Sequence, residues 1–544
     1  MGKTKENQIR EKKQKFKPED RDGGFPTGTP YLKRRFFEML PGLYVWTLML
    51  LPILFAIFKL ETALVIYLSF LTVYWLYRTI KFVIGCLIGV KRMQKSENTD
   101  WVKKIEELNI PRADKIDFIY LCPVYSESLE VLDPSFREWS KSDIGAKRIH
   151  VVMAMEEKKQ DLQLENFKKL KEKFGKQFGS MQYYIHPSGI EGEVAGVKGA
   201  NINWACRHLV QDLEKQGKDI HDYLLITCDS DLRPHKKYLS NVLHDYLLAE
   251  KPDETFFTSA IHTFNNNIWQ VPALIRNQSN MLTLVILYQW VLEKQLSIPF
   301  TDENVQEKET FSSYIVNLQT LKKLKFWDPE IPNDDTAFYW NSMVRSKGSF
   351  KGECVYVRTY NDAVENESFW KTHVSFYKQQ YRWGWGIVTY PITLSSMYDE
   401  SSKGFPFYRK FAMIKKMMEY LWFLTVVFVI SFAQVFMTLI NEEYQYSVYS
   451  YNLAKIISYI FSVITFSNIA ILYFRSQVTP SPQNWKWWNW ILNFAETFLI
   501  VINMLTFSFI PYVQAVTEMM LGLSKFKRNF YVTEKVRMKE KKKI

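Results

Sequence analysis

The chain has 544 residues, of which 16% are aromatic, and its formal net charge of +13 is concentrated in the first forty and the last twenty positions. Neither basic cluster interleaves aromatic residues as a nucleic-acid-binding segment does, and both flank apolar stretches. A lipid bilayer is therefore favoured over DNA or RNA as the partner. The five cysteines are scattered and form no Cys-x-x-Cys pair, which argues against a zinc site or a disulfide framework and fits a reducing compartment.

Two apolar stretches near the N-terminus, residues 43–58 and 64–90, are close to the length that crosses a bilayer. We expect residues 42–90 to form a transmembrane hairpin, preceded by a basic, disordered segment at 1–41. Basic side chains before the first stretch and near the end of the second predict that both ends of the hairpin lie in the cytosol.

Residues 91–389 have the composition of a soluble α/β domain. Short runs rich in β-branched and aromatic residues alternate with charged, helix-like stretches, which predicts a Rossmann-like domain with a mixed, mostly parallel sheet. The expected strands are residues 116–122, 148–155, 223–228 and 255–260, and the expected helices are residues 161–174 and 202–216. Transmembrane helices are expected both before and after this domain.

Residues 371–389 are dense in tyrosine and tryptophan and predict an amphipathic helix at the membrane interface, continued by an interfacial segment at 390–419. Two spans are expected at 420–440 and 456–474, within a membrane region that extends to 522.

The apolar stretch at 485–521 predicts either a tight hairpin or a bent helix in the membrane plane. Glu496 within it is interpreted first as a hydrogen-bonded helix contact and second as a polar group lining a polysaccharide path. The basic tail at 523–544 is expected in the cytosol.

Asp229-Ser230-Asp231 directly follows the apolar run at residues 223–228. Two acids one residue apart at the end of a buried parallel strand can point into the crevice where open α/β sheets bind ligands. Carboxylate oxygens there suit Mg²⁺ or Mn²⁺ that bridges to a diphosphate. Such a pair alone is weak evidence, because most matches are caps and turns.

Two further elements could carry chemistry, although each has an ordinary explanation. Lys198-Gly199 opens an expected helix and could approach a phosphate, but it could equally be a simple helix start. Asp334-Asp335 could hold a proton-accepting carboxylate, and acids are also common at a helix N-terminus. Both explanations of the acidic pair can hold at once.

Together with Cys122–Glu127 and Gln379-x-x-Arg382-Trp383, these elements resemble family 2 glycosyltransferases, in particular the membrane-embedded cellulose, chitin and hyaluronan synthases. The resemblance covers residues 116–383 and resumes at residues 530–535. It implies a domain of the glycosyltransferase A (GT-A) fold and a nucleotide-sugar donor.

The resemblance also implies a role for each matching residue in donor binding. Tyr125 would stack on the uracil of a UDP-sugar, with Glu127 and Glu156 among the nucleotide-sugar contacts. The family usually has an aspartate where this chain has Glu156. The remaining donor contacts would be Lys198 on a phosphate, Asp229 on the nucleotide and the metal, and Asp231 on the metal.

For catalysis the resemblance implies that Asp335, with Asp334 beside it, is the base. The same likeness assigns the diphosphate and the acceptor sugar to Gln379, Arg382 and Trp383. A gating loop that closes over the nucleotide would comprise Phe530, Val532, Thr533 and Lys535.

The sequence thus predicts an integral protein of the plasma (inner) membrane with its catalytic domain and both termini in the cytosol. Its expected function is inverting transfer from a nucleotide sugar to extend a β-linked polysaccharide. One alternative is the addition of a single sugar to a lipid-linked acceptor. A second alternative is a non-catalytic membrane scaffold or nucleotide-sugar sensor, which the two candidate catalytic elements Asp231 and Asp335 disfavour.

Overall fold

A seven-stranded sheet forms the centre of the α/β domain, in a computed structural model that describes residues 21–22, 24–191, 193, 197–293, 295–297, 304–306 and 308–523. In spatial order its strands are β13 (Lys351–Val355), β8 (Thr255–Ser259), β12 (Tyr314–Asn317), β6 (Tyr223–Thr227), β3 (Asp117–Val124), β4 (Ile149–Glu156) and β5 (Ser180–His186). Only β12 runs antiparallel to its neighbours. The sheet is therefore mixed and mostly parallel, as the sequence predicts.

Alternating side chains of the central strands enter two separate cores. In β3, Phe118 and Tyr120 join one buried cluster, whereas Ile119 and Leu121 join the other. The first core is covered by α5 (Leu129–Trp139), α6 (Gln160–Phe174) and α8 (Tyr238–Leu248). The second is covered by α7 (Lys198–Lys215), α9 (Ala273–Leu292) and α11 (Asp334–Arg345). Burial on both faces explains why these strands are nearly continuous apolar runs.

Smaller elements complete the domain. The short strands are β1 (Arg21–Asp22) with β2 (Phe25–Pro26), β10 (Gln295–Ser297) with β11 (Asn304–Gln306), and the set β7 (Arg233–Pro234), β14 (Thr359–Tyr360) and β9 (His262–Thr263). The remaining helices of the domain are α4 (Trp101–Leu108), α10 (Leu318–Lys323), α12 (Phe369–Gly384) and α13 (Thr389–Met397).

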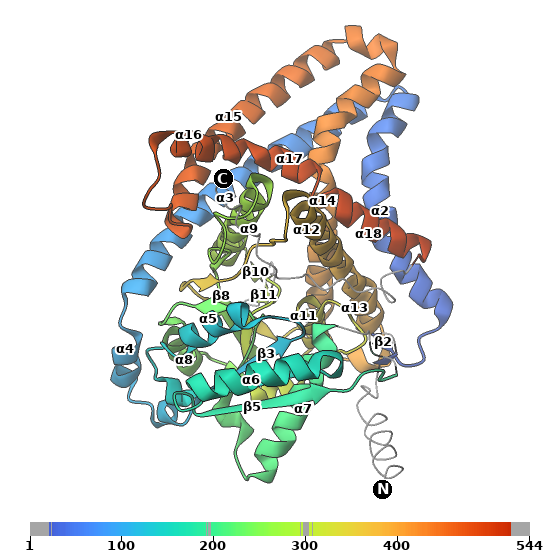
Figure 1. Ribbon diagram of the computed structural model, residues 1–544. Coiled ribbons are helices and arrows are strands. Elements are labelled where there is room, and N and C mark those ends of the chain that lie inside the picture. The colour runs from blue at the N-terminus through green and yellow to red at the C-terminus, as the bar shows by residue number, and fades with distance from the viewer. Residues whose placement is uncertain are drawn as a thin grey trace.

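Within the described residues, five helical segments are long and apolar enough to cross a membrane. They are α2 (Tyr31–Ile57), α3 (Glu61–Asn98), α14 (Phe407–Ile440), α15 (Val448–Val478) and the segment Trp487–Leu521. These helices gather on one side of the sheet, α14 packing on α2 and α15 on α3 (Figure 1). This arrangement is that of a membrane protein with an α/β domain between its spans in the sequence.

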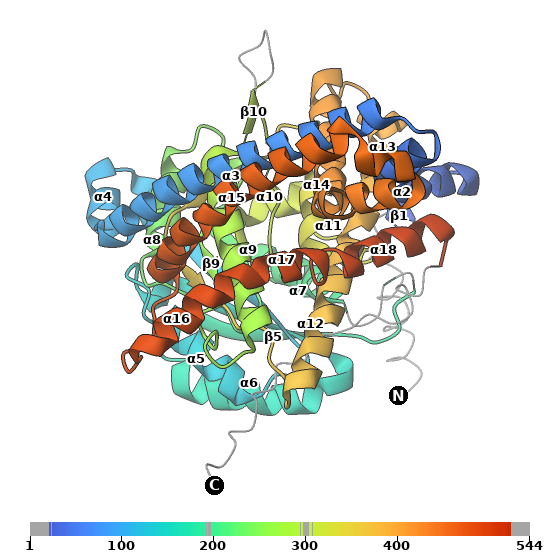
Figure 2. The ribbon, with the colours of Figure 1, turned by 90° about the horizontal axis from the view of Figure 1, so that it is seen from above.

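The segment Trp487–Leu521 consists of α16 (Trp487–Ala495), α17 (Leu499–Leu505) and α18 (Ile510–Leu521). These helices follow one another across the molecule without doubling back, so the segment is bent and is not a hairpin (Figures 1 and 2).

Glu496 at the first bend accepts hydrogen bonds from Arg276 Nε and Arg475 Nη2, both at 2.9 Å. This confirms the interpretation of Glu496 as a helix contact.

Candidate active site

A cavity of about 1630 Å³ begins at the carboxyl ends of β3 and β6 and continues among the apolar helices. The chain passes from β3 to β4 on one side and later places β6 on the other side of β3, so this edge is a topological switch point. The sheet topology thus brings the loop after β3 and the loop after β6 to the same opening, where parallel sheets bind ligands.

The Asp229–Asp231 loop is fixed by contacts from three other parts of the chain. The Asp229 carboxylate accepts a hydrogen bond from Lys198 Nζ at 3.1 Å, and Asp231 Oδ2 accepts one from the backbone N–H of Asp362 at 2.8 Å. Ser230 Oγ donates to Glu127 Oε1 at 3.3 Å. Both aspartates line the cavity, as the strand pattern predicts.

The loop after β3 is also held in a defined shape. Glu127 Oε2 accepts from the backbone N–H of Tyr125 at 2.6 Å, while Gln163 of α6 donates to the carbonyl oxygens of both residues at 3.2 Å. Tyr125 and Glu127 both line the cavity. Glu127 therefore joins the two loops, since it contacts Ser230 as well.

Lys198 lies at the centre of the acidic groups. Its Nζ is 3.1 Å from Asp229 Oδ1 and 3.8 Å from Asp334 Oδ2, and it donates to the carbonyl of Ser312 at 3.1 Å. Burial acts to lower the pKa of Lys198, but the neighbouring carboxylates outweigh it and hold that pKa above the ordinary value. The ammonium group is therefore charged. A Cβ at Gly199 would come within 2.9 Å of the Asp334 side chain, so glycine permits this close approach.

Asp334 and Asp335 form the first turn of α11, so the explanation as a helix N-terminus holds together with their position in the cavity. Burial raises the pKa of Asp334 to about 7, against the opposing effect of Lys198. Burial also raises the pKa of Asp335, while Lys198 and a hydrogen bond from the Thr336 backbone lower it. Asp335 Oδ1 accepts that bond at 2.7 Å. A carboxylate with a raised pKa is a stronger proton acceptor than one in water.

The loop before α11 is packed against the N-terminal part of the chain. The backbone N–H of Gly24 donates to Glu330 Oε2 at 3.0 Å, and Phe25 is buried with Ile331 and Ala337. Gly24 has a φ of +80°, a conformation that favours glycine. These contacts hold in place the loop that leads into Asp334 and Asp335.

Helix α12 contributes Gln379, Arg382 and Trp383 to the cavity wall. Asn333 Nδ2 donates to the carbonyl of Arg382 at 3.2 Å, which joins this helix to the residue that precedes Asp334. The positive charge of Arg382 lowers the pKa of Asp335, so the guanidinium and the carboxylate share one environment. The structure thus brings the three α12 residues predicted from the sequence to the same cavity as the acidic pair.

Glu156, at the end of β4, lines the cavity but is already paired. His186 Nδ1 lies 3.2 Å from Glu156 Oε2, and His186 Nε2 lies 2.9 Å from Glu193 Oε2. Burial acts to lower the pKa of His186, but the two carboxylates raise it to about 9. A protonated His186 therefore balances part of the negative charge at this edge.

Few carboxylates in the cavity are placed to bind a divalent cation together. The described residues contain no group of three His, Cys, Asp or Glu side chains that could hold a metal ion. Mg²⁺ usually binds through one or two carboxylates together with substrate phosphates and water, so the pair Asp229 and Asp231 fits it. His262 also lines the cavity, but its ring nitrogens contact the hydroxyls of Thr258 and Thr359 at 3.1 and 3.0 Å.

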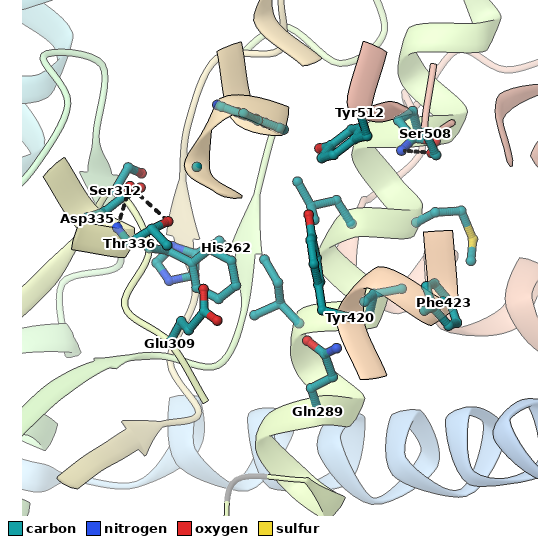
Figure 3. A pocket seen from close by; sticks show the side chains of 18 of the residues that line it. His262, Gln289, Glu309, Ser312, Asp335, Thr336, Tyr420, Phe423, Ser508 and Tyr512 are labelled. Carbon is teal, nitrogen blue, oxygen red and sulfur yellow. Dashed lines mark hydrogen bonds between the residues drawn. The ribbon is translucent and has the colours of Figure 1, made fainter. Parts of the chain in front are cut away.

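Several cavity residues carry no sequence motif. Figure 3 shows Glu309 beside His262 on the side of Asp335, with Tyr420 and Tyr512 across the cavity. Glu309 comes from the segment before β12, Tyr420 from a span and Tyr512 from α18, so only the folded chain brings them together. The predicted gating residues Phe530, Val532, Thr533 and Lys535 lie outside the described residues.

The sequence matches no protein-family model and no curated protein. Among solved structures, it is similar to a mannosyltransferase from Pyrobaculum calidifontis in complex with GDP-mannose and Mn²⁺, at 10% identity and a TM-score of 0.37, over 78% of this chain and 99% of that one. It is also similar to residues 1–349 of TarS from S. aureus, at 12% identity and a TM-score of 0.30, over 61% and 91% of the two chains. A third similar structure is GalNAc-T7 with UDP, GalNAc and Mn²⁺, at 10% identity and a TM-score of 0.28, over 56% of this chain and 54% of that one.

Proposed function

We propose that this protein is an inverting, family 2-like glycosyltransferase that uses a UDP-sugar and Mg²⁺ or Mn²⁺ at the cytosolic face of the plasma (inner) membrane. The observation that carries the proposal is the placement of Asp229, Asp231, Lys198 and Asp335 around one cavity at the switch point of the sheet. A binding protein would have no need of a half-buried carboxylate with a raised pKa facing the ligand space.

The donor side of the reaction requires compensation of negative charge. Breaking the bond between the anomeric carbon and the diphosphate leaves charge on the departing nucleotide, which Lys198 and Arg382 are positioned to offset. Asp229 and Asp231 would hold the divalent cation, which when bound supplies Lewis-acid stabilisation of the diphosphate. Tyr125 provides an aromatic surface for the base, with Glu127 supporting its loop.

The acceptor side requires a base. The acceptor hydroxyl forms a bond to the anomeric carbon as its proton passes to Asp335, and the nucleoside diphosphate leaves from the opposite face. One displacement inverts the anomeric configuration, so an α-linked donor gives a β-linked product. Trp383 offers a stacking surface for an acceptor sugar, and Gln379 offers polar contacts.

The family resemblance implies that the transferred sugar extends a β-linked polysaccharide. The addition of one sugar to a lipid-linked acceptor is a second candidate, because the cavity continues among apolar helices. Purified protein incubated with a panel of radiolabelled nucleotide sugars, with and without EDTA, tests the proposal. We expect cation-dependent incorporation from a UDP-sugar, with a ladder for polysaccharide or one product for single addition. No incorporation from any nucleotide sugar with any membrane acceptor fraction would refute it.

A further inference from the structure

The two ends of the cavity differ in charge. Among the described lining residues at the end formed by the catalytic domain, acidic side chains outnumber basic ones. At the end nearer the apolar helices the order is reversed, with five basic side chains against three glutamates. The basic set is Arg78, Lys81, Lys308, Lys415 and Lys416. An excess of positive charge in a partly closed space favours an anionic ligand.

Several of these basic groups act on one another, since the charges of Lys416 and Arg78 both act on Lys308. Arg78 Nη1 lies 2.7 Å from Glu293 and 3.0 Å from Glu419, so it links α3 to α9's C-terminal end and to α14. Lys416 Nζ lies 3.6 Å from Glu309 Oε1. The cluster therefore lies where two apolar helices meet the catalytic domain, at the level where lipid head groups would be expected.

Lys308 differs from the other members of the cluster because it does not flank a span. It belongs to the segment that precedes β12, it is 7% exposed, and its Nζ donates to Gln289 Oε1. Burial and the nearby charge of Lys416 lower its pKa to about 7. The excess of lysine that is common at cytosolic membrane borders does not explain a buried lysine within the catalytic domain. Glu309 and Glu293 act in the opposite direction, and a bound anion would add to their effect in keeping Lys308 charged.

The cluster is close to the proposed base. Thr310 Oγ1 donates to the backbone carbonyl of Asp335, and Lys308 is two residues before Thr310. Two residues of extended chain span at most about 7 Å. The backbone of Lys308 is therefore close to the start of α11, and both Lys308 and Asp335 line the same cavity.

Beyond the cluster the cavity is mostly apolar. It passes between α14, α15 and α17, where Phe423, Val427, Phe461, Ile500 and Val501 line it. No charged side chain from the described part of α15 or α17 lines it. A space of this kind fits a hydrocarbon chain.

We infer that the acceptor is an amphiphile whose phosphate-type anionic group is held by Lys308 and Lys416, with its hydrocarbon chain between α14, α15 and α17. This inference rests on the proposed sugar transfer and, of its two candidate products, on the addition of one sugar to a lipid acceptor. The transferred sugar becomes bonded to a hydroxyl of the head group, the proton of that hydroxyl passes to Asp335, and the nucleoside diphosphate leaves. The phosphate group of the acceptor is unchanged in the reaction.

Binding of short-chain lipids tests the inference without any sugar donor. We would titrate the full-length protein in neutral detergent with dioctanoyl phosphatidic acid, dioctanoylglycerol and inorganic phosphate, following tryptophan fluorescence, since Trp422 lines the cavity. Phosphatidic acid should bind at least about tenfold more tightly than the uncharged lipid, the range expected for one charged hydrogen bond. Lys308→Met and Lys416→Gln should each remove about tenfold of that affinity.

Lys403→Gln is the matched control, because Lys403 is a surface lysine 79% exposed and paired with Glu400. Wild-type affinity in that variant supports a specific site, whereas an equal loss in all three variants overturns the inference. Equal binding of the charged and uncharged lipids, or binding of inorganic phosphate as tight as that of the lipid, also overturns it. Thermal unfolding midpoints verify that the variants fold. UDP titration of the same samples separates the two claims, because missing UDP binding refutes the proposed function whatever the lipid result.

Discussion

The substitution Asp335→Asn tests the proposed base while changing the site very little. The asparagine carbonyl can still accept the 2.7 Å hydrogen bond that the Thr336 backbone donates to Asp335 Oδ1, so the start of α11 should be retained. The amide cannot take a proton from the acceptor. General-base catalysis contributes about 10²–10⁴ in rate, and we therefore expect turnover to fall at least about 100-fold.

Asp335 is proposed to act on the acceptor and not on the donor, so UDP affinity should stay within a few-fold of wild type. The pH profile supplies a second result. Because burial raises the pKa of Asp335, the acidic limb of the wild-type turnover profile should lie above about 4, the ordinary aspartate value, with turnover lost as the pH falls through it. That limb should be absent from the residual activity of the variant.

The assay is transfer of radiolabelled sugar by purified protein at saturating donor, with UDP affinity measured separately by titration. Turnover within threefold of wild type would refute the assignment of Asp335. A parallel loss of UDP affinity and unfolding temperature would instead show that Asp335 acts in folding.

Asp231→Ala should weaken UDP binding only in the presence of Mg²⁺ or Mn²⁺, and an equal loss with EDTA in titrations would instead indicate a structural role. His186 has a pKa raised from 6.5 to about 9 by Glu156 and Glu193, so it stabilises the fold at low pH and this contribution, up to about 3 kcal/mol, is lost as the pH rises from 6.5 through 9. The thermal unfolding midpoint should therefore fall over that pH range in wild type and fall less in His186→Gln. An equal dependence of the midpoint on pH in both proteins would contradict this role of His186. Phe530→Ala and Thr533→Ala should each lower turnover by about tenfold with UDP binding nearly unchanged, as expected for a closing loop, and full activity after truncation at Leu523 would argue against the loop.

The central strands and their acidic ends could be predicted because burial on both faces leaves a clear apolar run. β3, β4, β6 and β8 lie within two residues of the expected ranges, and Asp229 and Asp231 follow directly from the end of β6. Lys198 also begins a helix, as expected.

The strands that the sequence did not reveal have weaker patterns for physical reasons. β5 and β13 are the two edges of the sheet, where fewer side chains are buried, and β13 contains Lys351, Gly352 and Glu353. β12 is central but has only four residues and runs antiparallel between β6 and β8. Antiparallel insertion of such a short strand depends on tertiary pairing and not on local pattern.

The basic cluster beside the acidic pair was hidden in the sequence for a similar reason. Lys308 and Glu309 have no motif around them, and their significance depends on α14 placing Lys416 beside them. The bends of the segment Trp487–Leu521 depend on partners as well, since Glu496 is held by arginines from α9 and α15. Contacts between distant segments cannot be read from local periodicity.

The anomeric configuration of the product tests the central claim most directly. Purified protein would be supplied with an α-linked UDP-sugar, Mn²⁺ and membrane lipids, and the product linkage would be determined by the proton coupling constant of its anomeric centre. A single displacement with Asp335 as base predicts a β-linked product that forms only with the divalent cation present. An α-linked product, or equal transfer in EDTA, would contradict the account.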